Sequence, residues 1–219
     1  MTYNWQQKDW TKFSYDISKL EDKLYAFAEK SGRISGILKA MTREDHVQTM
    51  INIMVAEAIK TSEIEGEYLS RIDVISSIRN NLGLNANPER VKDKNAEGMA
   101  TLITDVQNSY AEKLTKEKLF DWHKMIFPLA SNINVGGWRL HEDPMQVVSG
   151  RIDKPVVHFE APPSKLVPLE MDNFIAWFNQ TAPNGSRTIK HAAIRCLSLT
   201  FILKQFIHLK MAMDVLDVL

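Results

Sequence analysis

One short string carries most of the side chains that could do chemistry here. Thr61-Ser62-Glu63-Ile64-Glu65-Gly66 places hydroxyls and carboxylates close together at the end of an apolar-periodic segment. A carboxylate can form a strong bidentate pair with a guanidinium. A threonine, a glutamate and a glycine at a helix end are also typical of a solvated helix terminus. The role of this string therefore depends on the elements around it.

Other kinds of site have little support in the sequence. None of the six histidines has a second ligand at helical spacing. The single cysteine, Cys196, can form neither an internal disulfide nor a cysteine-based zinc site. No glycine-rich loop of the phosphate-cradling kind is present. We predict no metal site, and the lone cysteine favours a reducing compartment such as the cytoplasm.

Composition and charge narrow the class of protein. A chain of 219 residues with 44% hydrophobic content can bury one substantial core or two small ones. The 27 basic and 27 acidic side chains balance, so no long-range field attracts nucleic acid or an anionic membrane. Residues 1–12 lack the apolar run of a signal peptide. We expect a globular, cytoplasmic protein with neither nucleic acid nor membrane as partner.

The first part of the chain has helical periodicity. A helix is predicted from an apolar stripe of Phe13, Ile17, Leu20, Leu24 and Phe27. A second helix should begin near Thr42, with Asp45 completing a capping box, and end around Glu65. Ser70 should cap a third helix that stops at Gly83. Residues 84–94 are polar and contain a proline, which predicts a boundary between a domain 1–87 and a domain 88–219.

The second part alternates helices with one hairpin. Helices are predicted through Met99–Tyr110, from Thr115 to Pro128, through Leu169–Phe178, and from Ile189 onward. Between them, Met145–Val148 and Val156–Phe159 are β-prone runs separated by a long tip. The predicted fold is therefore mainly α with one β-hairpin.

Two of these features together resemble a known family. Thr61 to Gly66 resembles the inhibitory helix of Fic proteins, which transfer AMP to protein hydroxyls. Gly137-Trp138-Arg139, the hairpin and Phe159-Glu160-Ala161-Pro162-Pro163 resemble the flap region of Fic domains in order and spacing. Residues 1 to about 85 are similar to the helical N-terminal extension of a large bacterial group of these proteins.

The resemblance implies a Fic-type helical bundle and a role for each matching segment. Thr61, Glu65 and Gly66 would regulate the enzyme, with Glu65 paired to an arginine of the catalytic motif. The flap would align a target protein by strand-like pairing, through Gln146, Val147, Val148, His158 and Phe159. ATP and Mg²⁺ are the substrate and cofactor that it implies for an intact member, with a motif histidine as general base.

The catalytic motif of that family is missing. This motif should follow the last predicted helix and reads His-Pro-Phe, any residue, Asp or Glu, Gly-Asn-Gly-Arg, any two residues, Arg. Residues 206–219 occupy that place but contain no glycine or arginine. When the codons of Met211-Ala212 and of Met213-Asp214 are read two bases late, each pair yields a glycine codon. The two glycines have the spacing of the Gly-Asn-Gly part of the motif. With allowed third bases the segment becomes His-Pro-Phe-Lys-Asp-Gly-Asn-Gly-Arg-Ile-Gly-Arg-Ala. We infer a frame change near Cys196 to Ser198, so the second domain is out of frame from about residue 197.

This chain is therefore expected to be inactive and to bind neither ATP nor Mg²⁺, while an intact form would transfer AMP to a target protein. Two alternatives stay open. Residues 197–219 could be a genuine apolar C-terminal helix, and the chain could be a non-catalytic helical interaction module of an antitoxin-like kind. The sequence leaves the oligomeric state open, homo-oligomers included.

Overall fold

The computed structural model describes residues 2–130, 134–142, 145–151 and 153–206. Within them the protein is mainly α-helical, with a single two-stranded antiparallel sheet. The elements in chain order are α1 (Glu21–Ala40), α2 (Arg43–Ile64), α3 (Arg71–Asn81), α4 (Lys94–Ser109), α5 (Lys116–Ile126), β1 (Gln146–Arg151), β2 (Lys154–Glu160), α6 (Val167–Thr181) and α7 (Ala192–Phe206). Short 3-10 turns occupy Asn4–Gln6, Ile17–Lys19 and Ser164–Leu166. The mainly α class with one hairpin is confirmed.

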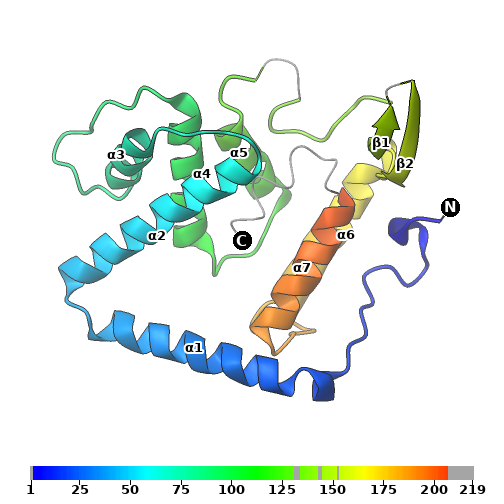
Figure 1. Cartoon of the computed structure of the whole chain (residues 1–219), viewed down its shortest axis with the longest axis horizontal. Helices are drawn as coiled ribbons and strands as arrows, with labels where there is room; N and C mark the ends of the chain where they lie inside the picture. Colours follow the sequence, from blue (N-terminus) through cyan, green and yellow to red (C-terminus); the bar gives the residue numbers. More distant parts are fainter. Residues whose placement is uncertain (1, 131–133, 143–144, 152, 207–219) are drawn as a thin grey trace.

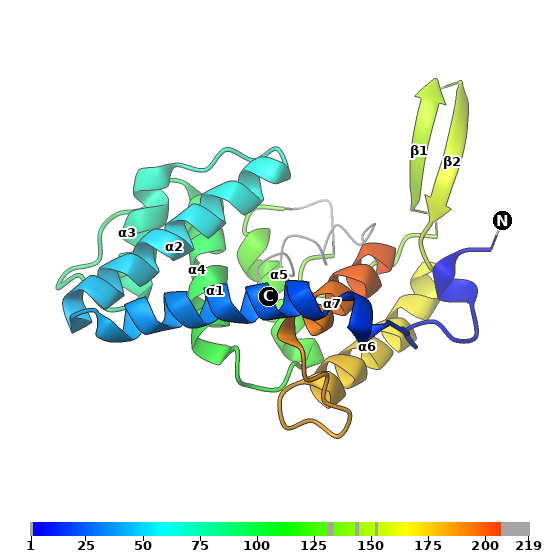
Figure 2. The same ribbon diagram turned by 60° about the horizontal axis from the view of Figure 1, so that its bottom comes forward.

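Helices α2 to α5 lie together on one side of the molecule, and α6 and α7 lie side by side on the other (Figure 1). Helix α1 runs along the molecule between the N-terminal segment and the start of α2 (Figure 1). The hairpin extends away from the helices at the start of α6 (Figure 2). No helix in the described ranges combines the length and the apolar character that crossing a membrane requires.

The helix ends follow local capping chemistry. The Thr42 hydroxyl accepts a hydrogen bond from the Asp45 N–H at 3.1 Å, and the Ser70 hydroxyl accepts one from the Asp73 N–H at 3.3 Å. Side-chain oxygens at these positions satisfy N–H groups that the first helical turn leaves free. Gly83 ends α3 with φ +66°, a left-handed conformation that favours glycine. The predicted starts of α2 and α3 are therefore confirmed.

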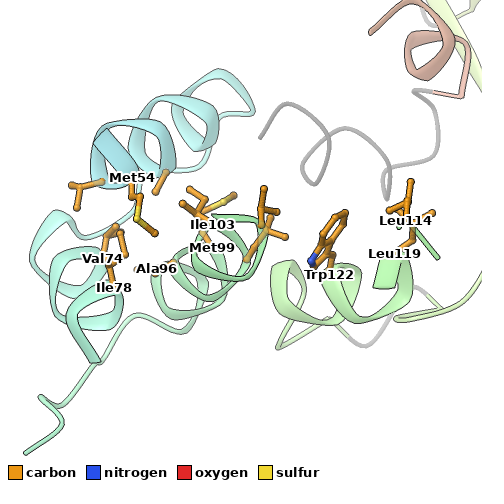
Figure 3. Close-up of a cluster of buried hydrophobic side chains, with 14 of the residues drawn as sticks. Met54, Val74, Ile78, Ala96, Met99, Ile103, Leu114, Leu119 and Trp122 are labelled. Atoms are coloured by element: carbon orange, nitrogen blue, oxygen red, sulfur yellow. The ribbon is translucent and has the colours of Figure 1, made fainter. Parts of the chain in front are cut away.

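One core joins the two halves of the chain. Buried side chains of α2 and α3 pack against α4, which packs in turn on α5 (Figure 3). The residues labelled in Figure 3 are Met54, Val74, Ile78, Ala96, Met99, Ile103, Leu114, Leu119 and Trp122. Asp93 links the start of α4 to the start of α3, because its carboxylate caps α4 and also accepts a hydrogen bond from the N–H of Ser70, the N-cap of α3, at 3.0 Å. The core thus includes residues on both sides of the predicted boundary at residue 88, and the boundary itself stays a prediction.

Two local predictions are wrong. The stripe through Phe13 and Ile17 is not one helix, because Asp16 caps a 3-10 turn at Ile17–Lys19 and α1 begins only at Glu21. The hairpin has no long tip, because strand pairing continues to Arg151 opposite Lys154. Residues 207–219, where the shifted frame would encode most of the catalytic motif, lie outside the described residues.

Candidate functional site

The end of α2 brings Glu65 and Gly66 to the surface, whereas Thr61, the third predicted regulatory residue, is buried. Glu65 closes the last turn, since its N–H donates to the Thr61 carbonyl at 3.3 Å. Gly66 follows with φ +82°, and its N–H donates to the Glu63 carbonyl at 3.1 Å. A residue with a Cβ is strained at this φ. Glycine at position 66 therefore ends the helix and turns the chain toward Leu69.

A pocket of about 340 Å³ opens beside this helix end. Its polar lining consists of Thr61, Ser62, Glu65, Glu67 and Asn95. Its apolar lining consists mainly of Leu69 before α3, Met99 of α4, Ile126 at the end of α5, and Phe127 and Leu129 directly after it. A volume of this size is within the range of small-molecule sites. The structure thus brings Thr61 and Glu65 into one pocket, whereas Gly66 supplies the turn and is not among the lining residues.

The pocket is acidic. Glu65 and Glu67 are the charged residues among those that line it, and both are exposed. The nearby Lys60 is engaged elsewhere, because its ammonium group lies 2.6 Å from the Glu63 carboxylate. Among the described residues Glu65 has no basic partner within ion-pair distance, and no group of three or more histidine, cysteine or acidic residues is arranged to hold a metal ion. The pocket therefore attracts cations rather than phosphate groups.

The residues predicted for the flap form the hairpin and do not line this pocket. Val147 pairs with Phe159 and Val148 pairs with Val157, so His158 is the extra residue of a β-bulge. The His158 Nε2 lies 2.6 Å from the Ser149 hydroxyl, and the Gln146 amide donates to the Glu160 carboxylate at 2.7 Å. Val147, Val148 and His158 are exposed. The two sets of predicted residues thus occupy two separate places on the molecule.

The N-terminal segment reaches the base of the hairpin. The Trp5 indole N–H donates to the Glu160 carbonyl at 2.8 Å, and the ring centroids of Tyr3 and Phe159 are 5.3 Å apart in an edge-to-face arrangement. Such an aromatic pair adds about 1 kcal/mol beyond the burial of its area. The N-terminal residues therefore help to position the end of β2.

Two buried basic side chains lie near α5. His123 is 1% exposed, its Nδ1 accepts from the Gly136 N–H at 2.8 Å, and burial lowers its pKa to about 4. Arg139 donates through Nη2 to the Pro162 carbonyl, and burial lowers the pKa of its guanidinium. The His123 Nε2 and the Arg139 Nε and Nη1 have no hydrogen-bond partner in the part of the chain that the structure describes. These contacts fix the segment between α5 and the hairpin.

Sequence reasoning missed most of the pocket wall. Ser62 and Glu67 lie in or beside the string that was singled out, so their proximity could have been suspected from spacing alone. Met99 and Phe127 carry no such signal, because their place in the pocket depends on how α4 and α5 pack against the end of α2. Helical periodicity shows that such residues are apolar and face inward, but it does not show which neighbours they meet.

Comparison with known proteins gives a limited result. Residues 3–84 match the model of a protein family described as a domain of unknown function, DUF4172. The match covers well under half of the chain and ends before α4. No curated protein matches the chain. Residues 3–84 are thus similar to a family without an assigned activity.

Proposed function

We propose that this chain is the scaffold of a Fic-type AMP transferase whose catalytic motif is encoded out of frame. One observation carries the proposal. Helix α7 (Ala192–Phe206) follows the hairpin and α6 and directly precedes the codons in which the shifted frame would encode His-Pro-Phe. In the family that the sequence resembles, the motif follows a helix at this point in the chain order. The order of flap, α6 and α7 supports the same assignment.

The pocket beside α2 supports a regulatory role for Glu65. In an intact form an arginine of the motif would pair with this carboxylate and hold it against the catalytic loop. Glu65 is exposed, and its pocket is lined by no basic residue from the part of the chain that the structure describes. An inhibitory carboxylate would be exposed and without a basic neighbour in this way if its arginine partner had been lost.

The hairpin supports the binding of a target segment. Among the described residues β1 pairs with β2 alone, so the other edge of β1 presents backbone N–H and C=O groups. An extended peptide can pair with such an edge. Val147 and Val148 lie exposed along β1, where they would contact the side chains of the added strand.

The residues at the pocket do not fit ATP. ATP would supply the AMP group and Mg²⁺ would neutralise the phosphates, but a phosphate beside Glu65 and Glu67 would be repelled. Its described lining contains no lysine or arginine. We therefore assign no catalytic step to this chain, and we expect the nucleotide to bind only when the motif is restored.

Two chains expressed from the same gene test the proposal. The first is the chain as it stands, and the second has its frame restored from about codon 197. We expect only the second to bind ATP and to transfer labelled AMP from ATP to protein. Within the second, Glu65→Gln should raise transfer, and Glu63→Gln, whose carboxylate pairs with Lys60 outside the pocket, should not. Transfer by the chain as it stands, or none by the restored chain, would contradict the proposal.

A non-catalytic interaction module remains the second candidate, and α1 is the observation that favours it. This helix has no buried residue along its whole length. Tyr25, Ile34 and Ile37 are exposed along it, and apolar side chains in such numbers on one helix are typical of a surface that another protein covers. A restored chain that neither binds ATP nor transfers AMP, yet associates stably with another protein through α1, would favour this function.

A further inference from the structure

The pocket beside α2 has a wall and a rim of different chemistry. Met99, Ile126, Phe127 and Leu129 supply an apolar wall, and the exposed carboxylates of Glu65 and Glu67 line it beside them. Pockets that hold small molecules combine a mostly apolar lining with a few polar groups that orient the ligand. The cavity of about 340 Å³ is large enough for a ligand of several non-hydrogen atoms.

The charge of the pocket selects the ligand. Glu65 and Glu67 are both acidic, and none of the described residues that line the pocket is a lysine or arginine. The C-terminal ends of α2 and α5 both lie at the pocket, where Glu65 and Ile126 belong to its lining, and the C-terminus of a helix carries a partial negative charge. Lys94, at the start of α4, is paired with Glu97 at 2.6 Å. The field in the pocket therefore favours a positively charged group.

A hydroxyl of a largely buried residue faces the same pocket. Ser62 is 4% exposed and lines the cavity, and its side chain forms no hydrogen bond with another described residue. Its Oγ is not among the fully buried polar atoms without a partner, so it is accessible from the cavity. The neighbouring Thr61 hydroxyl, by contrast, contacts the Glu57 carboxylate at 3.4 Å. A hydroxyl oxygen that faces a cavity can accept a hydrogen bond from a donor group of a ligand. This observation is independent of the carboxylates and points to a ligand with N–H donors.

We propose that this pocket binds a small organic cation with a guanidinium or ammonium head and a short apolar body. The head contacts the carboxylates of Glu65 and Glu67 and donates to the Ser62 hydroxyl. The body lies along Met99 and Phe127, where the aromatic ring also attracts a cation. The inference does not depend on AMP transfer, because every group that it uses is present in the chain as it stands.

The matched probes are butylguanidinium and its neutral isostere butylurea. Their binding to the full chain is measured by isothermal titration calorimetry. A ligand of this size should bind with a dissociation constant of about 1 mM, and butylurea should bind at least about tenfold more weakly. Replacing both Glu65→Gln and Glu67→Gln should weaken butylguanidinium binding about tenfold, and Ser62→Ala about threefold. Glu63→Gln is the control on the same helix and should leave binding unchanged.

Hydrogen exchange locates the bound cation. Butylguanidinium should slow exchange in residues 61–69 and 126–130, and not in the hairpin. The inference fails if butylurea binds as tightly as butylguanidinium, if the double glutamine variant binds as well as the wild type, or if the protection lies elsewhere. It fails equally if no saturable binding is seen at about twenty times the expected dissociation constant. Glu65 and Glu67 are exposed, so their substitution leaves the core intact.

Discussion

His123 is a buried histidine whose protonation opposes folding. Burial lowers its pKa from 6.5 to about 4 in the folded protein, so the unfolded chain binds more protons at this residue between these values. The free energy of unfolding therefore rises as the pH rises from about 4 to 6.5. The stability that neutral His123 contributes is lost as the pH falls through the same window. We expect the contribution of His123 to this loss to be up to about 3 kcal/mol between pH 6.5 and 4.

The variant His123→Asn tests this expectation, because an asparagine oxygen can still accept from the Gly136 N–H but does not titrate. Denaturant unfolding at several pH values should give a shallower dependence on pH in the variant than in the wild type. His46→Asn is the control at an exposed histidine and should keep the wild-type slope. Equal slopes for His123→Asn and the wild type would show that this histidine does not control acid stability.

At the same scale, the sequence indicated part of the candidate site. Thr61 and Glu65 could be singled out because hydroxyl, carboxylate and glycine recur in a recognisable pattern at a helix end. Phe127 could not, since its aromatic ring reaches the pocket only because α5 ends beside α2. Ser62 shows the limit most clearly. Its type and position were visible in the sequence, but its burial at the edge of a pocket became visible only in the packed structure.

Among the elements, the contact between α4 and α5 depends on one glycine. A Cβ at Gly98 would lie 1.9 Å from the Met125 carbonyl oxygen, which belongs to the backbone of α5. We expect Gly98→Ala to force the helices apart and to lower the free energy of unfolding by about 2 kcal/mol or more. Gly32→Ala is a matched change in α1, where nothing lies within 4 Å, and it should stabilise the protein by about 1 kcal/mol.

Chemical denaturation of both variants measures the difference directly. The prediction concerns the opposite signs of the two effects, because the alanine gains helix propensity in both helices and meets a steric clash in only one. A Gly98→Ala variant as stable as the wild type would show that α4 and α5 do not approach each other as closely as the structure has them.

The elements themselves were predictable where local chemistry decides them. The capping residues Thr42 and Ser70 fixed the starts of α2 and α3. The apolar stripe from Phe13 was misleading, because Phe13 packs edge-to-face on Phe201 from an irregular segment instead of a helix. Periodicity cannot distinguish a helix from a loop whose apolar residues contact distant helices. The hairpin tip was misjudged since the polar residues near Gly150 pair as strand.

On the scale of the whole molecule, the N-terminal and C-terminal parts share contacts as well as a core. Trp5 donates to Glu160 at the base of the hairpin, and Phe13 packs on Phe201 of α7. Helix α7 also exposes Leu197 and Phe201 near the inferred frame change. The same helix buries Leu199 and Ile202 in the core.

Sequencing the gene from codon 190 onward shows whether the catalytic motif is encoded out of frame. We expect the bases of codons 206–219, read two positions late, to encode His-Pro-Phe, an acidic residue, and a Gly-Asn-Gly-Arg turn followed by a second arginine. We also expect this frame to continue open beyond the turn. Bases that encode neither the turn nor the histidine in that frame, or a stop codon inside the motif, would contradict this expectation.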